Sequence, residues 1–354
     1  MSAQGPPKQQ QSRGIRLLLL ALCAAVTVLI AGEGGLQASV HQGWPPRLAD
    51  PEGYAHPLCD PWYWRTLARQ RGTDSDRMAH PILGWVSPNE VRATTSVPRV
   101  DQDVPIAPVV MIGDSFLAGT TAESDTIPSI VDSTLRAAGV MASVEDLAVG
   151  GYGLDQILLR LRARASSLES GTPVVIGVLT TDIDRAVLWE REAPKPRFSL
   201  GERGRLVLST DHVSEPMPAP EARLLMWARW RRYWDGRAAR DAGLPHSECR
   251  VDEKRALGRA LLLAVVETCE DAGLRCLVVP FLRAEDHNRP PAWREHLIES
   301  STSSLAQLSV RSILETTDGE LYQADRHPSR TQNRAVGVAI AEWVGTALSD
   351  STTP

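Results

Sequence analysis

The chain has 354 residues, of which 43% are hydrophobic and 23% charged, and its formal net charge is −5. This is an ordinary globular composition, long enough for one large core with insertions or for two domains. The weakly acidic balance and the absence of a long Lys/Arg block exclude a general affinity for nucleic acid, so we expect no nucleic-acid partner.

The amino terminus is predicted to be a targeting segment. Three basic residues precede an uncharged apolar run from Leu17 to Ala31. This run is short for a membrane span but suits the hydrophobic region of a signal sequence, and extension to residues 15–32 makes it a tight membrane anchor. Because the positive charge lies before the run, we expect the rest of the chain to be exported. The sequence leaves open whether residues 1–32 are a cleaved signal peptide or a retained anchor.

Residues 33–105 are rich in Gly, Pro and polar residues. We interpret them as a linker and an amino-terminal extension that packs on the main domain. One helix is expected near Pro61–Arg71, and a turn followed by a strand is expected over His80–Val86. The main domain is then expected to span residues 106–350.

Four cysteines follow the apolar run, where export would allow disulfides to persist. Their pairing cannot be deduced from the sequence. Cys269 and Cys276 flank the end of a predicted helix and the start of the next strand, so a bridge between them is compatible with the pattern. No C-x-x-C or H-x-x-x-H spacing occurs, so no metal site is expected.

Strands and helices alternate in the main domain. The alternation predicts a mainly parallel sheet covered by helices on both faces. The expected strands are Val109–Ile112, Ser143–Val149, Val174–Leu179, Cys276–Phe281 and Val310–Leu314. The expected helices are Ile127–Ala138, Leu154–Leu168, Asp252–Ala272 and Ser329–Leu348.

Residues 186–250 interrupt this alternation and are interpreted as an insertion or cap. A hairpin is expected from Phe198–Leu200 and Arg205–Ser209, followed by a helix from about Pro220 to Asp241. Leu224 and three tryptophans share one face of that helix. We expect this face to pack on the core. The alternatives are an aromatic wall over a substrate cleft and a surface that rests on a membrane.

The candidate chemistry begins with Ser115, in a Gly-Asp-Ser sequence directly after the first strand of the main domain. Open α/β sheets place their functional groups at the carboxyl ends of strands. A serine nucleophile needs a base and a group that orients the base. His327 lies in Asp-Arg-His-Pro, where Pro328 keeps it out of helical geometry. We therefore expect His327 at the same sheet edge, with Asp325 orienting its ring, while Asp114 structures the loop.

Gly-Asp-Ser after the first strand and Asp-x-His-Pro before the last helix resemble the SGNH (GDSL-type) hydrolase superfamily. A third block, from Asp146 to Gly153, agrees with this resemblance. It implies a three-layer α/β/α sandwich with a mainly parallel, flavodoxin-like five-stranded sheet. It also implies acyl transfer by a triad of Ser115, His327 and Asp325, with no metal or organic cofactor. The backbone amides of Ser115 and Gly151 would form the oxyanion hole.

One block departs from the pattern of the superfamily. Where the superfamily has Gly-x-Asn-Asp, this chain continues through Thr181 to Asp182, which puts Asp182 in the place of the Asn oxyanion donor. An ionised carboxylate cannot donate a hydrogen bond. Three explanations are open: Asp182 is held protonated, Thr181 or a backbone N–H replaces the donor, or the reaction is a transfer or mere binding. Arg185, one helical turn later, can pair with Asp182, which favours an ionised structural role.

Three functions follow from this interpretation. The first is an exported serine esterase that acts on an acyl ester, such as an acetylated envelope glycan. The ten Trp against three Phe are compatible with carbohydrate contacts. The second is an O-acyltransferase of envelope polysaccharide assembly, and the third is a catalytically impaired binding domain. The membrane partner would be reached through residues 15–32. The sequence does not specify the natural substrate or the oligomeric state.

Overall fold

The computed structural model describes a large part of the chain, which divides into two compact units. The described residues are 8–71, 78–86, 106–191, 193–211, 213, 215–241, 249–289 and 292–351. The helical unit contains residues 1–73 and 218–248, and the sheet unit contains residues 74–217 and 249–354. Residues 72–77 and 87–105 of the expected linker and extension lie outside the described residues.

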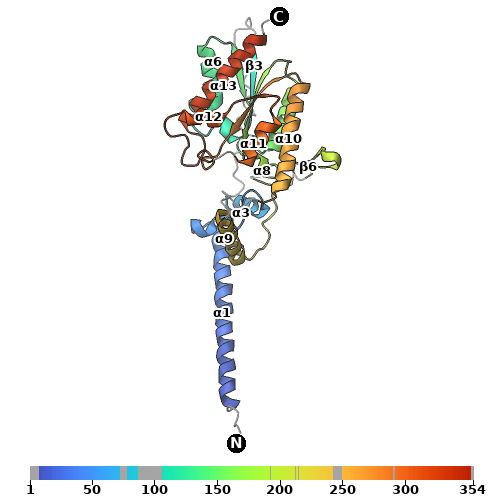
Figure 1. The fold of residues 1–354 in the computed structure, drawn as a ribbon. Coiled ribbons are helices and arrows are strands. Elements are labelled where there is room, and N and C mark those ends of the chain that lie inside the picture. The colour runs from blue at the N-terminus through green and yellow to red at the C-terminus, as the bar shows by residue number, and fades with distance from the viewer. Residues whose placement is uncertain are drawn as a thin grey trace. The chain divides into compact units, whose positions relative to one another are not determined.

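A five-stranded parallel sheet forms the centre of the sheet unit (Figure 1). Its order is β4-β3-β5-β8-β9, and every neighbouring pair is parallel. The flavodoxin-like order expected from the resemblance is therefore confirmed. The strands are β3 (Ala107–Ile112), β4 (Ala142–Asp146), β5 (Pro173–Leu179), β8 (Arg275–Phe281) and β9 (Ala306–Gln307).

Helices cover both faces of this sheet, as the alternation predicts. Along β3, Val109 and Met111 belong to one core cluster, whereas Val110 and Ile112 belong to the other. This alternation follows from the two-residue period of a strand. The first cluster includes side chains of α6 (Ile127–Ala137) and α13 (Arg330–Ser351), and the second includes side chains of α7 (Leu154–Ala165) and α10 (Val251–Asp271).

The fifth strand was expected at Val310–Leu314, and this prediction is wrong. The segment forms α12 (Val310–Glu315), and the edge strand is the short β9 just before it. The Ser309 side chain accepts a hydrogen bond from the Ser312 N–H, which caps a helix start. Val310 and Leu314 are both buried, and their spacing of four residues fits one helix face. The apolar residues of this segment therefore follow the helical period.

Smaller elements complete the sheet unit. The expected hairpin is confirmed as antiparallel β6 and β7, and a second antiparallel pair is formed by β1 and β2. Cys269 at the end of α10 and Cys276 in β8 form a disulfide, with Cα atoms 6.3 Å apart. The remaining elements of this unit are β1 (Met78–His80), β2 (Gly84–Val86), α5 (Ser115–Ala118), η2 (Glu123–Asp125), α8 (Asp182–Arg185), β6 (Arg197–Leu200), η3 (Glu202–Gly204), β7 (Leu206–Ser209) and α11 (Trp293–Ser301).

A buried ion pair holds the segment between α8 and β6 to helix α7. The Lys195 ammonium contacts the Asp155 carboxylate, and both side chains are fully buried. The ammonium also donates to the backbone oxygens of Leu188 and Pro196, each at 3.2 Å. Burial lowers the pKa of Lys195 and raises the pKa of Asp155, while each partner opposes the shift of the other.

The variant Lys195→Met is expected to lower the free energy of unfolding by about 3–5 kcal/mol, because it leaves the Asp155 carboxylate buried without its cation. Chemical denaturation of the full chain, followed by near-UV circular dichroism, measures the loss. The double variant Lys195→Met/Asp155→Asn removes both charges and should recover part of the lost unfolding free energy. A single variant as stable as the native chain would contradict the assignment.

The helical unit consists of four α-helices and one short 3-10 helix among the described residues. They are α1 (Lys8–Gln42), α2 (Pro46–Ala49), η1 (Pro51–Gly53), α3 (Pro61–Arg71) and α9 (Leu225–Asp241). Residues Arg16–Gln42 of α1 are long and apolar enough to cross a membrane, and no part of their most apolar stretch is buried. The hydrophobic region of a signal sequence has a similarly apolar composition.

Helix α9 does not pack through its tryptophan face, so the packing expected for that face is wrong. Trp227, Trp230 and Trp234 are 59%, 52% and 45% exposed. The helix packs instead through Leu225 and Ala228, which belong to a small core with Val40 and Trp62. The helix also begins at Leu225, five residues after the predicted start.

Candidate active site

Ser115 lies directly beyond the carboxyl end of β3, where the sequence predicts it. It is the first residue of the short helix α5, and Asp114 is the N-cap. The Asp114 carboxylate accepts a hydrogen bond from the Phe116 N–H at 2.8 Å. This contact confirms the expected loop-structuring position of Asp114 and fixes the turn that presents Ser115.

The preceding glycine allows this turn to approach the neighbouring strand. A Cβ atom on Gly113 would lie 2.9 Å from the Gly177 carbonyl oxygen of β5. Any larger residue at position 113 would therefore displace the serine turn from the sheet. The close packing of this turn on β5 therefore explains why position 113 is a glycine.

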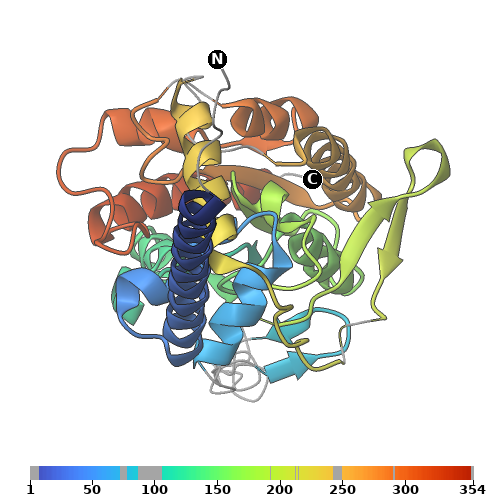
Figure 2. The same cartoon turned by 90° about the horizontal axis from the view of Figure 1, so that it is seen from below.

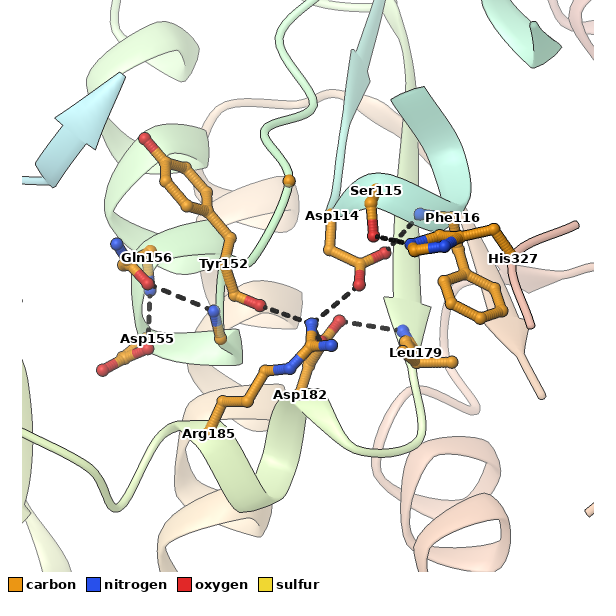
Figure 3. Close-up of polar contacts among 12 residues, drawn as sticks. Asp114, Ser115, Phe116, Tyr152, Asp155, Gln156, Leu179, Asp182, Arg185 and His327 are labelled. Carbon is orange, nitrogen blue, oxygen red and sulfur yellow. Dashed lines mark hydrogen bonds and ion pairs between the residues drawn. The ribbon is translucent and has the colours of Figure 1, made fainter. Parts of the chain in front are cut away.

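The structure brings Ser115, His327 and Asp325 together (Figure 3 shows the serine and the histidine). Ser115 Oγ lies 3.0 Å from His327 Nε2, although the two residues are 212 positions apart. On the other side of the ring, His327 Nδ1 lies 3.1 Å from Asp325 Oδ2. Both distances are within hydrogen-bonding reach.

A structured loop before α13 holds the histidine. The Gln323 N–H donates to the His327 carbonyl oxygen, and the Gln323 side chain donates to the Pro328 carbonyl oxygen, each at 2.8 Å. Arg326 adopts a left-handed φ of 70° at the turn. The imidazole packs against the ring of Phe116, with centroids 5.4 Å apart. Pro328 lies two residues before the helix, so it ends the loop and does not occupy the first helical turn.

Asp325 is the most exposed member of this group, with 57% of its side chain accessible. Its Oδ1 accepts a hydrogen bond from the His327 backbone N–H at 3.1 Å, while Oδ2 faces the ring. The backbone hydrogen bond is the largest cause that lowers the pKa of Asp325, and the contact with the His327 ring adds to it. The carboxylate is therefore the favoured form, as an orienting acceptor requires.

A glycine turn passes beside Ser115. The Val149 N–H donates to the Gly113 carbonyl oxygen at 3.0 Å and keeps this segment alongside β3. A Cβ atom on Gly150 would lie 3.7 Å from Ser115 Cβ. Gly151 has a φ of 89°, which favours glycine. No described residue accepts a hydrogen bond from the N–H of Ser115 or of Gly151.

Beneath the serine turn lies a buried charge cluster (Figure 3). Arg185 Nη1 lies 2.7 Å from Asp114 Oδ2 and 2.6 Å from Asp182 Oδ1. It also donates to the Tyr152 carbonyl oxygen at 3.0 Å. One guanidinium therefore links three segments that lie far apart in the sequence: the serine turn, the glycine turn and the end of β5.

Asp182 uses both carboxylate oxygens within this cluster. Oδ1 contacts Arg185, as the sequence predicts, and Oδ2 accepts a hydrogen bond from the Leu179 N–H at 2.9 Å. Burial, followed by repulsion from Asp114, raises the pKa of Asp182, and Arg185 opposes the shift. Since both oxygens face N–H donors, neither is free to donate a hydrogen bond toward a substrate.

Sequence reasoning missed the link between Arg185 and Asp114. These residues are 71 positions apart, and no local spacing indicates such a contact. It also missed Phe116, which supports the imidazole through ring packing. The only sequence signal for Phe116 is its place next to the candidate nucleophile, which is too general to identify its role.

The fold is thus an α/β sandwich with a serine, a histidine and an aspartate in hydrogen-bonding reach at the carboxyl edge of the sheet. No protein-family model matches the chain, and no curated protein matches it in sequence. A search of solved structures finds similar chains, among them proteins described as G-D-S-L family members and SGNH-hydrolase esterases.

Three of these structures illustrate the similarity. The chain resembles a lipolytic G-D-S-L family member from Veillonella parvula, at 10% identity and a TM-score of 0.39, over 68% of this chain and 98% of that one. It resembles the esterase EstA from a Pseudoalteromonas species at 12% identity and a TM-score of 0.36, over 67% of this chain and 98% of that one. It also resembles AlinE4, an SGNH-hydrolase family esterase, at 15% identity and a TM-score of 0.36, over 71% of this chain and 99% of that one.

Proposed function

We propose that this protein is an exported serine esterase that hydrolyses acyl esters, with Ser115 as its nucleophile. The observation that carries the proposal is the series of contacts from Ser115 Oγ to His327 Nε2 at 3.0 Å and from His327 Nδ1 to Asp325 Oδ2 at 3.1 Å. A serine hydroxyl attacks a carbonyl only when a base removes its proton, and this arrangement supplies the base and its orienting group.

In the proposed mechanism, Ser115 Oγ attacks the ester carbonyl carbon while His327 Nε2 accepts the hydroxyl proton. Asp325 accepts the hydrogen bond from the Nδ1–H group and stabilises the imidazolium that forms. The tetrahedral intermediate collapses when His327 returns the proton to the alcohol that leaves. A water molecule then attacks the acyl-serine by the same route, which releases the carboxylic acid and restores the hydroxyl.

The backbone N–H groups of Ser115 and Gly151 are proposed to stabilise the oxyanion, because no described residue accepts a hydrogen bond from either. Both carboxylate oxygens of Asp182 contact Arg185 or the Leu179 N–H, so Asp182 does not replace the asparagine as an oxyanion donor. Of the alternatives, we favour the neutral hydroxyl of Thr181, which lies in the turn after β5 and makes no capping hydrogen bond to α8.

The variant Thr181→Val, which has nearly the same shape, is expected to lower kcat by about 10²- to 10³-fold, the usual effect of losing one oxyanion donor. KM and the unfolding curve should change little. Asp182→Asn is the comparison, and it should not raise kcat because its side chain does not face the reacting carbonyl. Steady-state kinetics on a p-nitrophenyl ester measures both. Full activity of Thr181→Val would leave a backbone N–H as the third donor.

Export and membrane attachment are part of the proposal. Helix α1 offers an unburied apolar segment near the amino terminus, which suits a retained anchor. The disulfide between Cys269 and Cys276 fits a compartment where disulfides persist. We propose an acylated glycan as the substrate class, on the basis of the tryptophan excess and the resemblance to the superfamily.

The test is the fate of the acyl group from p-nitrophenyl acetate, with the full-length protein in detergent micelles. We expect free acetate to form in the same amount as p-nitrophenol, with or without added oligosaccharide. Transfer of the acetyl group to the oligosaccharide in preference to water would replace the esterase by an O-acyltransferase. No release of p-nitrophenol under any condition would overturn the proposal in favour of a binding domain.

A further inference from the structure

The helical unit carries an exposed aromatic face that the proposed reaction does not use. Trp227, Trp230 and Trp234 recur at spacings of three and four residues and therefore share one face of α9. Trp227 and Trp230 are stacked, with ring centroids 4.8 Å apart, and Trp230 meets Trp234 edge-on at 6.1 Å. Clustered exposed rings of this kind mark a surface that binds a partner or a membrane.

The first residues of α9 are hydrogen-bonded to Glu33 of α1. The Glu33 carboxylate accepts hydrogen bonds from the backbone N–H groups of Leu225 at 2.7 Å and Met226 at 2.9 Å. The Gln37 side chain donates to the Arg223 carbonyl oxygen at 2.7 Å. Glu33 is the first charged residue after the apolar run. The start of α9 is therefore fixed where the apolar part of α1 ends.

The aromatic face turns toward the apolar part of α1. Leu225 packs in the core that includes Leu36 and Val40, beyond Glu33. The next residue is rotated by about 100° around the helix, and its sulfur, Met226 Sδ, lies 3.4 Å from where a Cβ of Gly32 would be. At about 100° per residue, the three tryptophans lie about 140–200° from Leu225 around the helix, just beyond Met226. Asp235 lies at about 280°, on the side of α9 away from Met226.

The two views show that α9 runs crosswise to α1. In Figure 1 α1 is seen lengthwise and α9 is foreshortened, whereas in Figure 2 α9, in yellow, is seen lengthwise and α1 is foreshortened. A helix that crosses a membrane-spanning helix in this way lies in the plane of the membrane. This is the orientation of an interfacial amphipathic helix.

The dimensions place α9 at the boundary of the bilayer. Residues 15–32 span about 27 Å as an α-helix, close to the hydrocarbon thickness of about 30 Å. Trp and Tyr are enriched at the boundary between hydrocarbon and headgroups, and Arg suits the phosphates there. Besides its tryptophans, α9 exposes Tyr233, at 56%, and the guanidinium of the exposed Arg237 lies 5.5 Å from the centroid of the Trp234 ring.

We propose that the aromatic face of α9 (Trp227, Trp230 and Trp234) lies in the headgroup region of the same membrane that α1 spans, on its extracytoplasmic side. This inference rests on the proposed membrane attachment through α1. A second contact beside a single spanning helix would restrict rotation and tilt of the helical unit relative to the bilayer.

The test uses the full-length protein in lipid nanodiscs of phosphatidylcholine and phosphatidylglycerol. Cys23, the exposed free cysteine of α1, is labelled with the environment-sensitive fluorophore NBD in the native sequence. In a Cys23→Ala background, the same label is attached to Trp230→Cys and, as the matched control, to Asp235→Cys. Quenching by lipids with a nitroxide near the headgroup or near the chain terminus reports depth, and iodide reports exposure to water.

We expect chain-terminus nitroxides to quench the label at Cys23. Headgroup-level nitroxides should quench the label at Trp230→Cys at least about twofold more than the label at Asp235→Cys, as interfacial burial of one helix face requires. If the label at Cys23 is quenched but that at Trp230→Cys responds only to iodide, the face is in water and the inference is overturned while the anchor stands. If the Trp230→Cys label responds to neither quencher, protein covers the face, which also overturns it. No quenching at Cys23 would instead overturn the anchor.

Discussion

Replacement of Ser115 by alanine is expected to lower kcat for a p-nitrophenyl ester by about 10³- to 10⁶-fold, because no acyl-serine can form. The substitution removes one oxygen from a partly buried turn that Asp114 and Gly113 hold in place, so the unfolding curve should not change. Some activity above that of water should remain, since the backbone N–H groups proposed for the oxyanion hole are unchanged in this variant.

The histidine provides a second and sharper form of this test. His327→Ala should reduce kcat to a similar level, and the double variant Ser115→Ala/His327→Ala should be no worse than either single one, because the two groups act as a unit. His296→Ala is the matched control, since His296 is an exposed histidine on α11, and it should retain native activity. Additive losses in the double variant would show that the two residues contribute independently and would contradict the proposed mechanism.

The variant Arg185→Met is expected to have the largest effect on stability near the site. It leaves the carboxylates of Asp114 and Asp182 buried without the guanidinium that lies 2.7 Å and 2.6 Å from them. Loss of one partner from a buried charge network costs about 3–5 kcal/mol of unfolding free energy. Because Asp114 also caps the serine turn, kcat should fall as well.

Two comparison variants make this prediction specific. Arg164→Met removes an arginine that contacts Glu145 at 2.9 Å near the surface, and it should cost no more than about 1 kcal/mol. The double variant Arg185→Met/Asp182→Asn removes one of the stranded charges and should recover part of the stability lost in Arg185→Met. Urea denaturation of the full chain gives all three values. Equal losses for Arg164→Met and Arg185→Met would contradict the structural role assigned to the buried cluster.

The sheet could be predicted from the sequence where local signals were strong. Val174–Leu179 is an unbroken apolar run, as a strand buried on both faces requires, and it forms most of β5. Ser115 and His327 could be placed at one sheet edge because each lies next to the end of a predicted element. Their mutual distance depends on how the loop before α13 folds, and no sequence pattern specifies that.

Other features could not be predicted because they depend on contacts between distant segments. The apolar residues of Val310–Leu314 follow the helical spacing of three and four, but the segment is too short for this period to be distinctive. The cap at Ser309 begins the helix. Asp182 matched the position of an oxyanion donor by alignment, yet its contacts with Arg185 and Leu179 turn it into the protein interior. The tryptophan stripe of α9 was expected in a core, but the helix also has a second apolar face at Leu225 and Ala228, which packs instead.

Mapping of a fluorophosphonate adduct by peptide mass spectrometry tests the activated serine most directly. The full-length protein is treated with the reagent, digested, and the modified residue is identified, with the variant His327→Ala treated in parallel. A single adduct on Ser115 that forms far more slowly in His327→Ala is the expected result. An adduct on another residue, or an unmodified Ser115 in a preparation that hydrolyses esters, would contradict the proposal that the imidazole activates this hydroxyl.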